Sequence, residues 1–405
     1  MPITASRVFR PPFRGFLAAR AVSLFGTSMS TVALAFGVLG ASGDAADLGI
    51  VLAANLGPGL LLLLVGGAVA DRFPRRAVLV AANLGAGLTQ AGVAAVLLTG
   101  NYHLAVVSGL ALVNGALEAF ASPALRGIVA ELVPAADLHK ANSVLASTRN
   151  AVRIVAPVLA GVVTAAVGGG WAVAVDAGSF LVAAALLARL PVDTRGPRGR
   201  GSLLPDIRHG WREFRARPWV WSTSLSFCLV NLINVGPWMV LGPALVAERG
   251  GAAAWGLVLG VRAIGLLTMS VLVYRVVLSR PLRAGALAGA FGGLPLIALG
   301  TGADLPVLMA CAFVAALGFA VSGVTWETAL QQHVPRDVLS RVSSYDDLLS
   351  FGAIPVGLLL VGPAAGRWGA DAVTLVCGVA YAVAVLLPLT SRSVRELGSA
   401  SPPAG

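Results

Sequence analysis

Long apolar runs recur along the whole chain and are separated by short polar connections. A helix that crosses a bilayer needs about 20 consecutive, mostly apolar residues. On that template, the chain predicts spans at 15–40, 48–70, 77–99, 103–123, 144–167, 171–190, 219–246, 254–277, 283–301, 305–326, 345–366 and 371–390. The pattern therefore predicts an all-α integral membrane protein with twelve transmembrane helices in two six-helix halves.

The longest polar stretch, 191–218, separates an N-terminal half, 1–190, from a C-terminal half with a short tail, 219–405. Within this stretch, apolar side chains recur at helical spacing with arginines on the opposite face, which is typical of a helix on a membrane surface. Those apolar residues are Leu204, Ile207, Trp211 and Phe214. We predict a cytoplasmic linker that contains an amphipathic surface helix, and the alternative is a disordered linker.

The two halves repeat each other in sequence. Residues 131–144 and 332–345 share valine, leucine, a basic residue and serine at a constant separation, and Pro157 and Pro355 follow in the next spans. Six helices per copy give both copies the same orientation. This arrangement is found in transporters whose halves are related by an axis along the membrane normal.

Arginine positions orient the predicted spans. The connections after the first, third, fifth and ninth spans contain no Arg or Lys, whereas the opposite connections and the termini hold most of the 29 basic residues. Basic residues are enriched in cytoplasmic connections. We therefore predict a multi-pass protein of the bacterial cytoplasmic (inner) membrane with both termini in the cytoplasm.

Composition narrows the function classes. Hydrophobic residues are 57% of the chain and charged residues 12%, and the mean hydropathy is +0.85, so lipid surrounds most of the chain. The net charge of +11 comes from short loops and not from a continuous basic face, which argues against nucleic-acid binding. The only lysine, Lys140, follows a histidine, which excludes a Walker loop. Cys228, Cys311 and Cys377 have no paired spacing, so we expect no metal, no cofactor and no enzymatic site.

A charged turn, GAVADRFPRR, follows the second span. It resembles the G-x-x-x-D-R-x-G-R-R signature of the major facilitator superfamily, with proline in place of one glycine, at Gly67, Asp71, Arg72, Arg75 and Arg76. The resemblance covers essentially the whole chain and implies the major facilitator fold. It also implies a gating latch in which Asp71 pairs with Arg126 near span 4 and with the start of span 11. The alternative is a basic turn that only sets the topology.

Several segments resemble the siderophore and macrolide exporter branch of this superfamily. These segments are 19–26, 128–161, 176–181, 208–220 and 331–342. In the fifth span, Pro157 and Gly161 match the antiporter motif G-P-x-x-G-G, while Ala156 stands where that motif has glycine. Small residues and a proline predict a bendable packing seam there.

Polar residues inside spans are candidates for the transport pathway, because ionisable groups are costly in a membrane. The resemblance implies that spans 1, 4, 7 and 10 line the cavity. On span 4, Asn114 and Glu118 are four residues apart and face the same way. Glu118 is the first candidate for a proton carrier, and the alternative is a salt bridge with a cytoplasmic arginine. On span 7, Asn231 and Asn234 either contact substrate or join helices.

Three arginines also lie inside spans. Arg20 in span 1 either faces substrate or extends its side chain to the membrane interface. Arg153 in span 5 and Arg262 in span 8 lie deeper and need either an anionic substrate group or a buried carboxylate.

The remaining candidates are acidic or aromatic. Asp176 belongs to span 6, which is peripheral in the family fold, so a structural role is favoured for it. Glu327 and Asp346 lie near the cytoplasmic ends of spans 10 and 11, where they either gate, cap a helix or bind protons. Trp238 and Trp326 are candidates for stacking on a flat or hydrophobic substrate.

Together these features predict a secondary transporter that works by alternating access and exports a drug, a macrolide or a siderophore-like molecule in exchange for protons. We expect a monomer in the lipid bilayer. One alternative is an uptake symporter for a nutrient or metabolite on the same fold. An alternative of another class is the membrane subunit of an ATP-driven complex.

Overall fold

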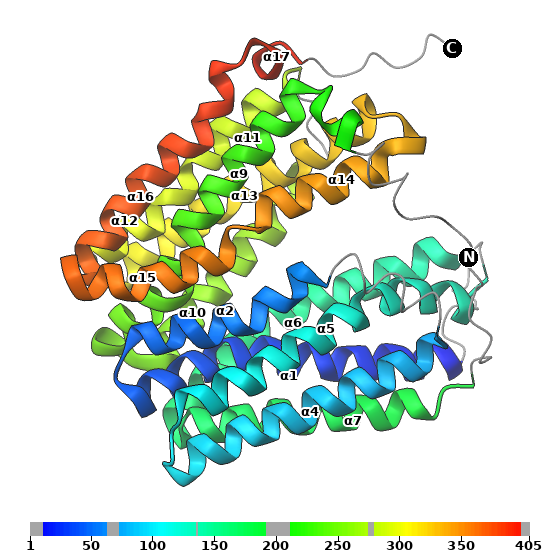
Figure 1. Cartoon of the computed structure of the whole chain (residues 1–405), viewed down its shortest axis with the longest axis vertical. Coiled ribbons are helices and arrows are strands. Elements are labelled where there is room, and N and C mark those ends of the chain that lie inside the picture. The colour runs from blue at the N-terminus through cyan, green and yellow to red at the C-terminus, as the bar shows by residue number, and fades with distance from the viewer. Residues whose placement is uncertain (1–10, 63–72, 135–136, 192–210, 274–278, 398–405) are drawn as a thin grey trace, which may run out of the picture. The chain divides into compact units, whose positions relative to one another are not determined.

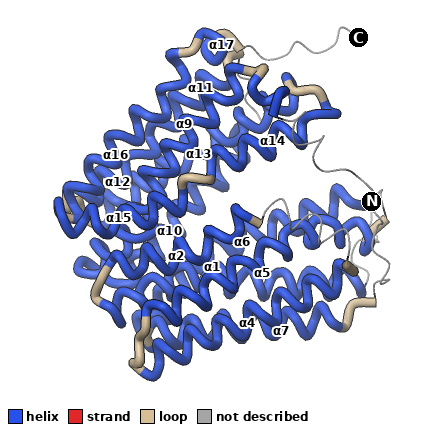
Figure 2. The backbone as a smooth tube through the Cα atoms, in the orientation of Figure 1, coloured by secondary structure: helices blue, strands red, loops and turns tan. Residues whose placement is uncertain are grey.

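The computed structural model describes residues 11–62, 73–134, 137–191, 211–273 and 279–397 (Figure 1). These residues form helices joined by short connections, and none of them lies in a strand (Figure 2). The prediction of an all-α chain is therefore confirmed.

The chain forms two compact units. Unit 1 comprises Met1–Arg200 and Val246–Leu257, and unit 2 comprises Gly201–Leu245 and Val258–Gly405. The helices of unit 1 are α1 (Pro11–Ser42), α2 (Ala45–Leu61), α4 (Arg75–Thr99), α5 (Leu104–Leu132), α6 (Leu138–Val167) and α7 (Gly169–Ala188). In this unit, α1 packs along α6 and α7, and α4 packs along α5 and α7. The predicted boundary between the halves stays a prediction, because residues 192–210 lie outside the described residues.

Unit 2 holds the remaining helices, except that α10 also contributes its residues 246–257 to unit 1. The long helices are α9 (Pro218–Gly236), α10 (Gly242–Val273), α13 (Leu305–His333), α14 (Arg336–Phe351), α15 (Ile354–Trp368) and α16 (Ala370–Leu386). The shorter elements are η3 (Pro237–Leu241), α11 (Pro281–Gly289), η4 (Ala290–Gly293), α12 (Leu294–Gly300), η5 (Leu387–Thr390) and α17 (Arg392–Arg395). In this unit, α9 packs against α14, α15 and α16.

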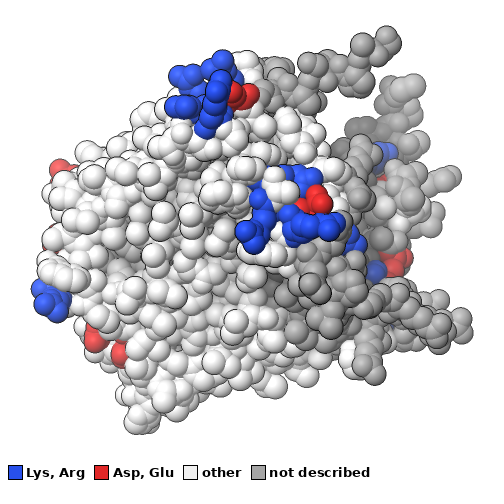
Figure 3. Space-filling model, turned by 45° about the horizontal axis from the view of Figure 1, so that its top comes forward, with Lys and Arg blue, Asp and Glu red and all other residues white. Residues whose placement is uncertain are grey.

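Ten helical segments among the described residues are long and apolar enough to cross a membrane. One of them, Pro218–Leu272, has 55 residues and contains both spans predicted at 219–246 and 254–277. The second predicted span corresponds to the 17-residue apolar helix α2, and its predicted continuation lies outside the described residues. All twelve predicted spans therefore fall on apolar helices. On the face drawn in Figure 3, most of the surface is uncharged, as lipid contact requires.

Several span boundaries differ from the prediction. Spans 4 and 10 continue to Leu132 and His333, because a helix keeps its internal hydrogen bonds after it leaves the apolar layer. The eleventh span, predicted as one helix, is divided into α14 and α15. Pro355 lies in the first turn of α15, where its missing N–H costs no helical hydrogen bond. Its counterpart Pro157 lies inside the continuous helix α6.

Backbones approach closely within each unit where a glycine faces a neighbouring helix. A β carbon on Gly115 of α5 would overlap the carbonyl oxygen of Asn55 of α2. A β carbon on Gly357 of α15 would likewise overlap the carbonyl oxygen of Leu232 of α9. Such close packing drives helix association in lipid, where burial from water provides no attraction.

A sharp corner at Gly251 interrupts α10. Its backbone has φ 65° and ψ −161°, a conformation that is essentially restricted to glycine. The corner separates the seventh predicted span from the eighth. The preceding turn, η3, is a π-helix, which often marks a functional position inside a longer helix.

The predicted surface helix is described only in part, since Leu204 and Ile207 lie outside the described residues. Residues 211–215 are helical. Phe214 is buried in the core of unit 2, and the Trp211 ring lies 5.4 Å from the Tyr345 ring, centroid to centroid. The described part of this segment therefore packs against unit 2.

Candidate functional site

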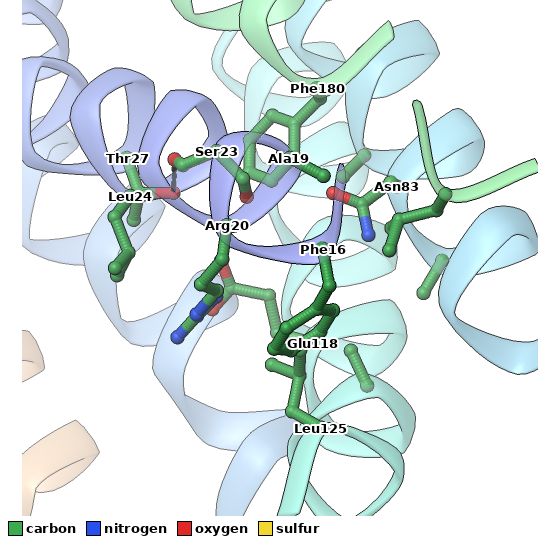
Figure 4. A pocket seen from close by; sticks show the side chains of 14 residues that line it. Phe16, Ala19, Arg20, Ser23, Leu24, Thr27, Asn83, Glu118, Leu125 and Phe180 are labelled. Carbon is green, nitrogen blue, oxygen red and sulfur yellow. Dashed lines mark hydrogen bonds between the residues drawn. The ribbon is translucent and has the colours of Figure 1, made fainter. Parts of the chain in front are cut away.

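A cavity of about 240 Å³ lies within unit 1, between α1, α4, α5 and α7 (Figure 4). Arg20 of α1 and Glu118 of α5 provide its charged groups. Apolar side chains form most of the remaining wall, among them Phe16, Leu24, Ala86, Leu125 and Phe180. The cavity therefore offers two charges in an apolar surrounding, which suits an amphipathic ligand.

Helix packing explains how these two charged side chains reach the cavity. Phe16 and Ala19 of α1 are buried and fix the rotation of that helix, so that Arg20 lies at the cavity. On α5, Asn114 is 4% exposed and its Oδ1 has no hydrogen-bond partner among the described residues. Glu118, one turn later, is exposed and lines the cavity, although it lies inside the span predicted at 103–123.

Charges of both signs lie at or near the cavity. The carboxylate of Glu118 attracts the guanidinium of Arg20, and Figure 4 shows the two side chains next to one another. Arg149 and Arg153 of α6 are near enough to repel Arg20. Both arginines are exposed, whereas Ala156 and Ala160 further along the same helix are fully buried. Positive charge therefore exceeds negative charge around Glu118.

Asp176 of α7 is fully buried in unit 1. Gln90 Nε2 of α4 donates to its Oδ2 at 2.8 Å and to Ser30 Oγ of α1 at 3.0 Å. This cluster joins three helices behind the cavity, as the structural interpretation of Asp176 predicts. Gln90 is a partner that the sequence reasoning missed.

Asp346 of α14 is the buried carboxylate of unit 2, with 6% of its surface exposed. Its Oδ1 accepts hydrogen bonds from Ser224 Oγ of α9 at 2.7 Å and from Ser350 Oγ at 3.0 Å. Its Oδ2 accepts a hydrogen bond from Trp326 Nε1 of α13 at 2.9 Å. Trp326 is itself 6% exposed and packs edge-on against Phe227, so its indole contacts protein. No sequence pattern predicted these partners.

The other candidates of unit 2 do not bond Asp346 directly in the described structure. Asn231 Nδ2 donates to the backbone oxygen of Ser350 at 2.8 Å, so it joins α9 to α14. The guanidinium of Arg262 lies 5.0 Å from the centre of the Trp238 ring in η3, a cation–π contact. Asn234 is half-buried on α9, and Glu327 is exposed on α13.

The described part of the charged turn connects helix ends within unit 1. Arg75 Nη1 at the start of α4 lies 2.9 Å from Glu131 Oε1 at the end of α5, and Arg76 donates to the backbone oxygen of Ala188. Gly67, Asp71 and Arg72 lie outside the described residues, as does the side chain of Arg126, so the predicted latch stays a prediction. Glu131 was missed, although the antiparallel hairpin of spans 3 and 4 places it opposite Arg75.

The predicted packing seam lies at a close helix contact within unit 1. Ala156, Pro157 and Gly161 are buried. A β carbon on Gly161 would lie 2.5 Å from the carbonyl oxygen of Ala252, and one on Gly256 would lie 2.5 Å from that of Pro157. Gly256 was not singled out from the sequence.

Two helical membrane units, the first of which contains a charged cavity between its helices, define a class of protein, the polytopic membrane transporters. Within that class the chain belongs to the Major Facilitator Superfamily, whose family profile matches residues 16–354. It is therefore a secondary transporter of small molecules and not an enzyme. This membership also removes the alternative of a subunit in an ATP-driven complex.

Relatives and solved structures agree with this assignment. The chain is 30% identical to the multidrug efflux pump Tap of Mycolicibacterium fortuitum, over 93% of this chain and 95% of that protein. It is 25% identical to the enterobactin exporter EntS of Escherichia coli, over 87% of this chain and 85% of that protein. The fold matches the crystal structure of the nucleoside transporter NupG with a TM-score of 0.78 at 12% identity, covering 94% of this chain and 99% of that one.

Proposed function

We propose that the chain exports a small organic or amphipathic molecule across the bacterial cytoplasmic membrane in exchange for protons. The observation that supports this most is Glu118, an exposed carboxylate beside Arg20 in an apolar cavity halfway along α5. The similarity to proteins described as a multidrug efflux pump and an enterobactin exporter favours the outward direction and this class of substrate.

Glu118 acts as the proton carrier in this proposal. A hydrogen-bond donor or an amine on the substrate competes with the proton for the carboxylate of Glu118. The transporter therefore binds substrate while it moves from inward-facing to outward-facing, and it binds a proton while it returns. Arg20 keeps the carboxylate oriented and stabilises its ionised form. The two halves of the chain alternate in access to the two sides of the membrane.

The membrane potential provides enough energy for such an exchange. One proton that enters across 100 mV releases about 2.3 kcal/mol, which sustains about a 50-fold gradient of a neutral substrate. The orientation that we propose places both termini and the arginine-rich connections in the cytoplasm. The chain works as a monomer, and no nucleotide is required.

Accumulation of ethidium and tetracycline in cells with and without the gene tests direction and coupling together. We expect lower accumulation in cells that carry the gene, and an uncoupler should remove the difference. Glu118→Gln should remove it as well, whereas the matched variant Glu396→Gln, at an exposed position beyond the last span, should behave like the parent. Higher accumulation in cells with the gene would indicate uptake, and export by Glu118→Gln at the parental rate would exclude Glu118 as the carrier.

A further inference from the structure

The carboxylate of Asp346 is surrounded by donors that carry no charge. Two hydroxyls and one indole N–H fill three of its acceptor positions, and they come from α9, α13 and α14. These helices pack together in unit 2 (Figure 1). A buried carboxylate is usually held ionised by an adjacent cation. Here hydroxyl and indole donors take that place, so the site does not depend on an ion pair.

Ser224 gives this site a second hydrogen-bonding arrangement. Its Oγ lies 2.7 Å from Asp346 Oδ1 and also 2.9 Å from the backbone oxygen of Val220. A hydroxyl has one proton to donate and lone pairs to accept with. When Asp346 is ionised, Ser224 donates to Oδ1. When Oδ1 carries a proton, Asp346 donates to Ser224, and Ser224 donates to Val220.

The other donors fit both arrangements without moving. Trp326 Nε1 can only donate, and it donates to Oδ2, which accepts in the ionised and in the protonated carboxyl. The contacts of Asp346 with Ser224, Ser350 and Trp326 are therefore compatible with either state. An unsatisfied buried polar group costs about 1–3 kcal/mol. Asp346 can bind or release a proton without this cost, because its hydrogen-bond partners remain satisfied in both states.

Asp176 in unit 1 provides a contrast. Its Oδ2 faces the amide nitrogen of Gln90, which cannot accept a proton. The hydroxyl of Ser179 lies 3.5 Å from Oδ1 and donates at 2.8 Å to the backbone oxygen of Asp176 itself. Ser30 Oγ of α1 also hydrogen-bonds Asp176, and it accepts from Gln90 Nε2. A proton on Asp176 would share that hydroxyl with Gln90, whereas Ser224 beside Asp346 can turn its own proton to the backbone oxygen of Val220.

We propose that Asp346 is a second proton-binding site, separate from the cavity, and that its occupancy reverses the hydrogen bond between α9 and α14. Asn231 of α9 already holds the last turn of α14, just before the break that leads into α15. The other titratable residues on the same three helices are Cys228, Cys311, Glu327, His333, Arg336, Asp337, Arg341, Tyr345 and Asp347. A role in coupling rests on the proposed function, whereas proton binding itself does not.

Infrared difference spectroscopy of the purified full-length chain in lipid nanodiscs tests the proposal. We expect acidification to produce a carbonyl stretch of a protonated, buried carboxyl that is absent from Asp346→Asn and retained in Asp176→Asn. In Ser224→Ala, which keeps the carboxylate but removes the acceptor, the same band should appear at a different frequency. Thermal unfolding of each variant establishes that it is folded.

A spectrum of the parent that contains no carboxyl band sensitive to Asp346→Asn, from mildly acidic to mildly alkaline pH, would overturn the proposal. So would a band that is identical in Ser224→Ala. Either result would leave proton-coupled export through Glu118 intact, because that export is measured independently in cells. Conversely, if the cell assay showed no export, we would still expect the infrared band that depends on Asp346.

Discussion

Unit 1 and unit 2 each place a carboxylate within a membrane span, and they stabilise it in opposite ways. Glu118 is exposed to a cavity and interacts with arginine charges, whereas Asp346 is enclosed and accepts hydrogen bonds from uncharged side chains. The first arrangement leaves the carboxylate open to ligands, and the second makes it part of the helix packing. The difference shows that depth along a span does not decide what a charged residue does.

Water access is the largest expected difference between the two regions. In a chain whose Cys228, Cys311 and Cys377 are replaced by alanine, Thr27→Cys in the cavity should react almost completely with a charged methanethiosulfonate reagent. Ser350→Cys beside Asp346 should remain almost unlabelled, because that position is 3% exposed. The measurement is the rate of mass increase of the purified protein. Similar rates for both cysteines would contradict the contrast, and denatured protein, in which both must react, is the control.

Stability should differ next most strongly. Asp346→Ala leaves the buried indole N–H of Trp326 without its acceptor, so we expect a loss of about 2–3 kcal/mol in the free energy of unfolding. Glu118→Ala removes an exposed side chain, and its effect should be within about 0.5 kcal/mol. Unfolding in mixed micelles provides both values, with Glu396→Ala as an exposed control. Equal losses for the two variants would mean that Glu118 is as firmly packed as Asp346.

The ion pair outside both regions should contribute least. Arg75 and Glu131 are 18% and 30% exposed, so a double-mutant cycle with Arg75→Gln and Glu131→Gln should give a coupling energy of about 0.5 kcal/mol. High salt should reduce that energy further. A coupling as large as the loss caused by Asp346→Ala would show that this helix-end contact is a main stabilising interaction of unit 1.

The spans and the place of Glu118 could be predicted from the sequence because both depend on local pattern. Apolar runs of sufficient length must be helical in lipid, since the backbone has no other hydrogen-bond partners there. Asn114 and Glu118 share a face because they are four residues apart. The break before Pro355 was not predicted, since Pro157 at the matching position is accommodated inside a continuous helix.

The partners of Asp346 and Asp176 could not be predicted because they depend on helix rotation between distant segments. Ser224 and Asp346 are 122 residues apart, and serine is common on the buried faces of membrane helices, so the sequence contains no signal that selects Ser224. The pairing of Arg75 with Glu131 could have been predicted from the sequence, because the short connection between spans 3 and 4 determines which helix ends lie opposite one another.

The corner at Gly251 also affects how the chain enters the bilayer during synthesis. At this kink only a few polar side chains, Glu248 and Arg249 among them, separate two apolar segments. Moving such a short polar connection across the hydrocarbon layer costs little free energy. If the first apolar segment inserted alone, the second apolar segment would remain exposed to water until it inserted as well. Spans 7 and 8 are therefore suited to enter the membrane together as a preformed hairpin.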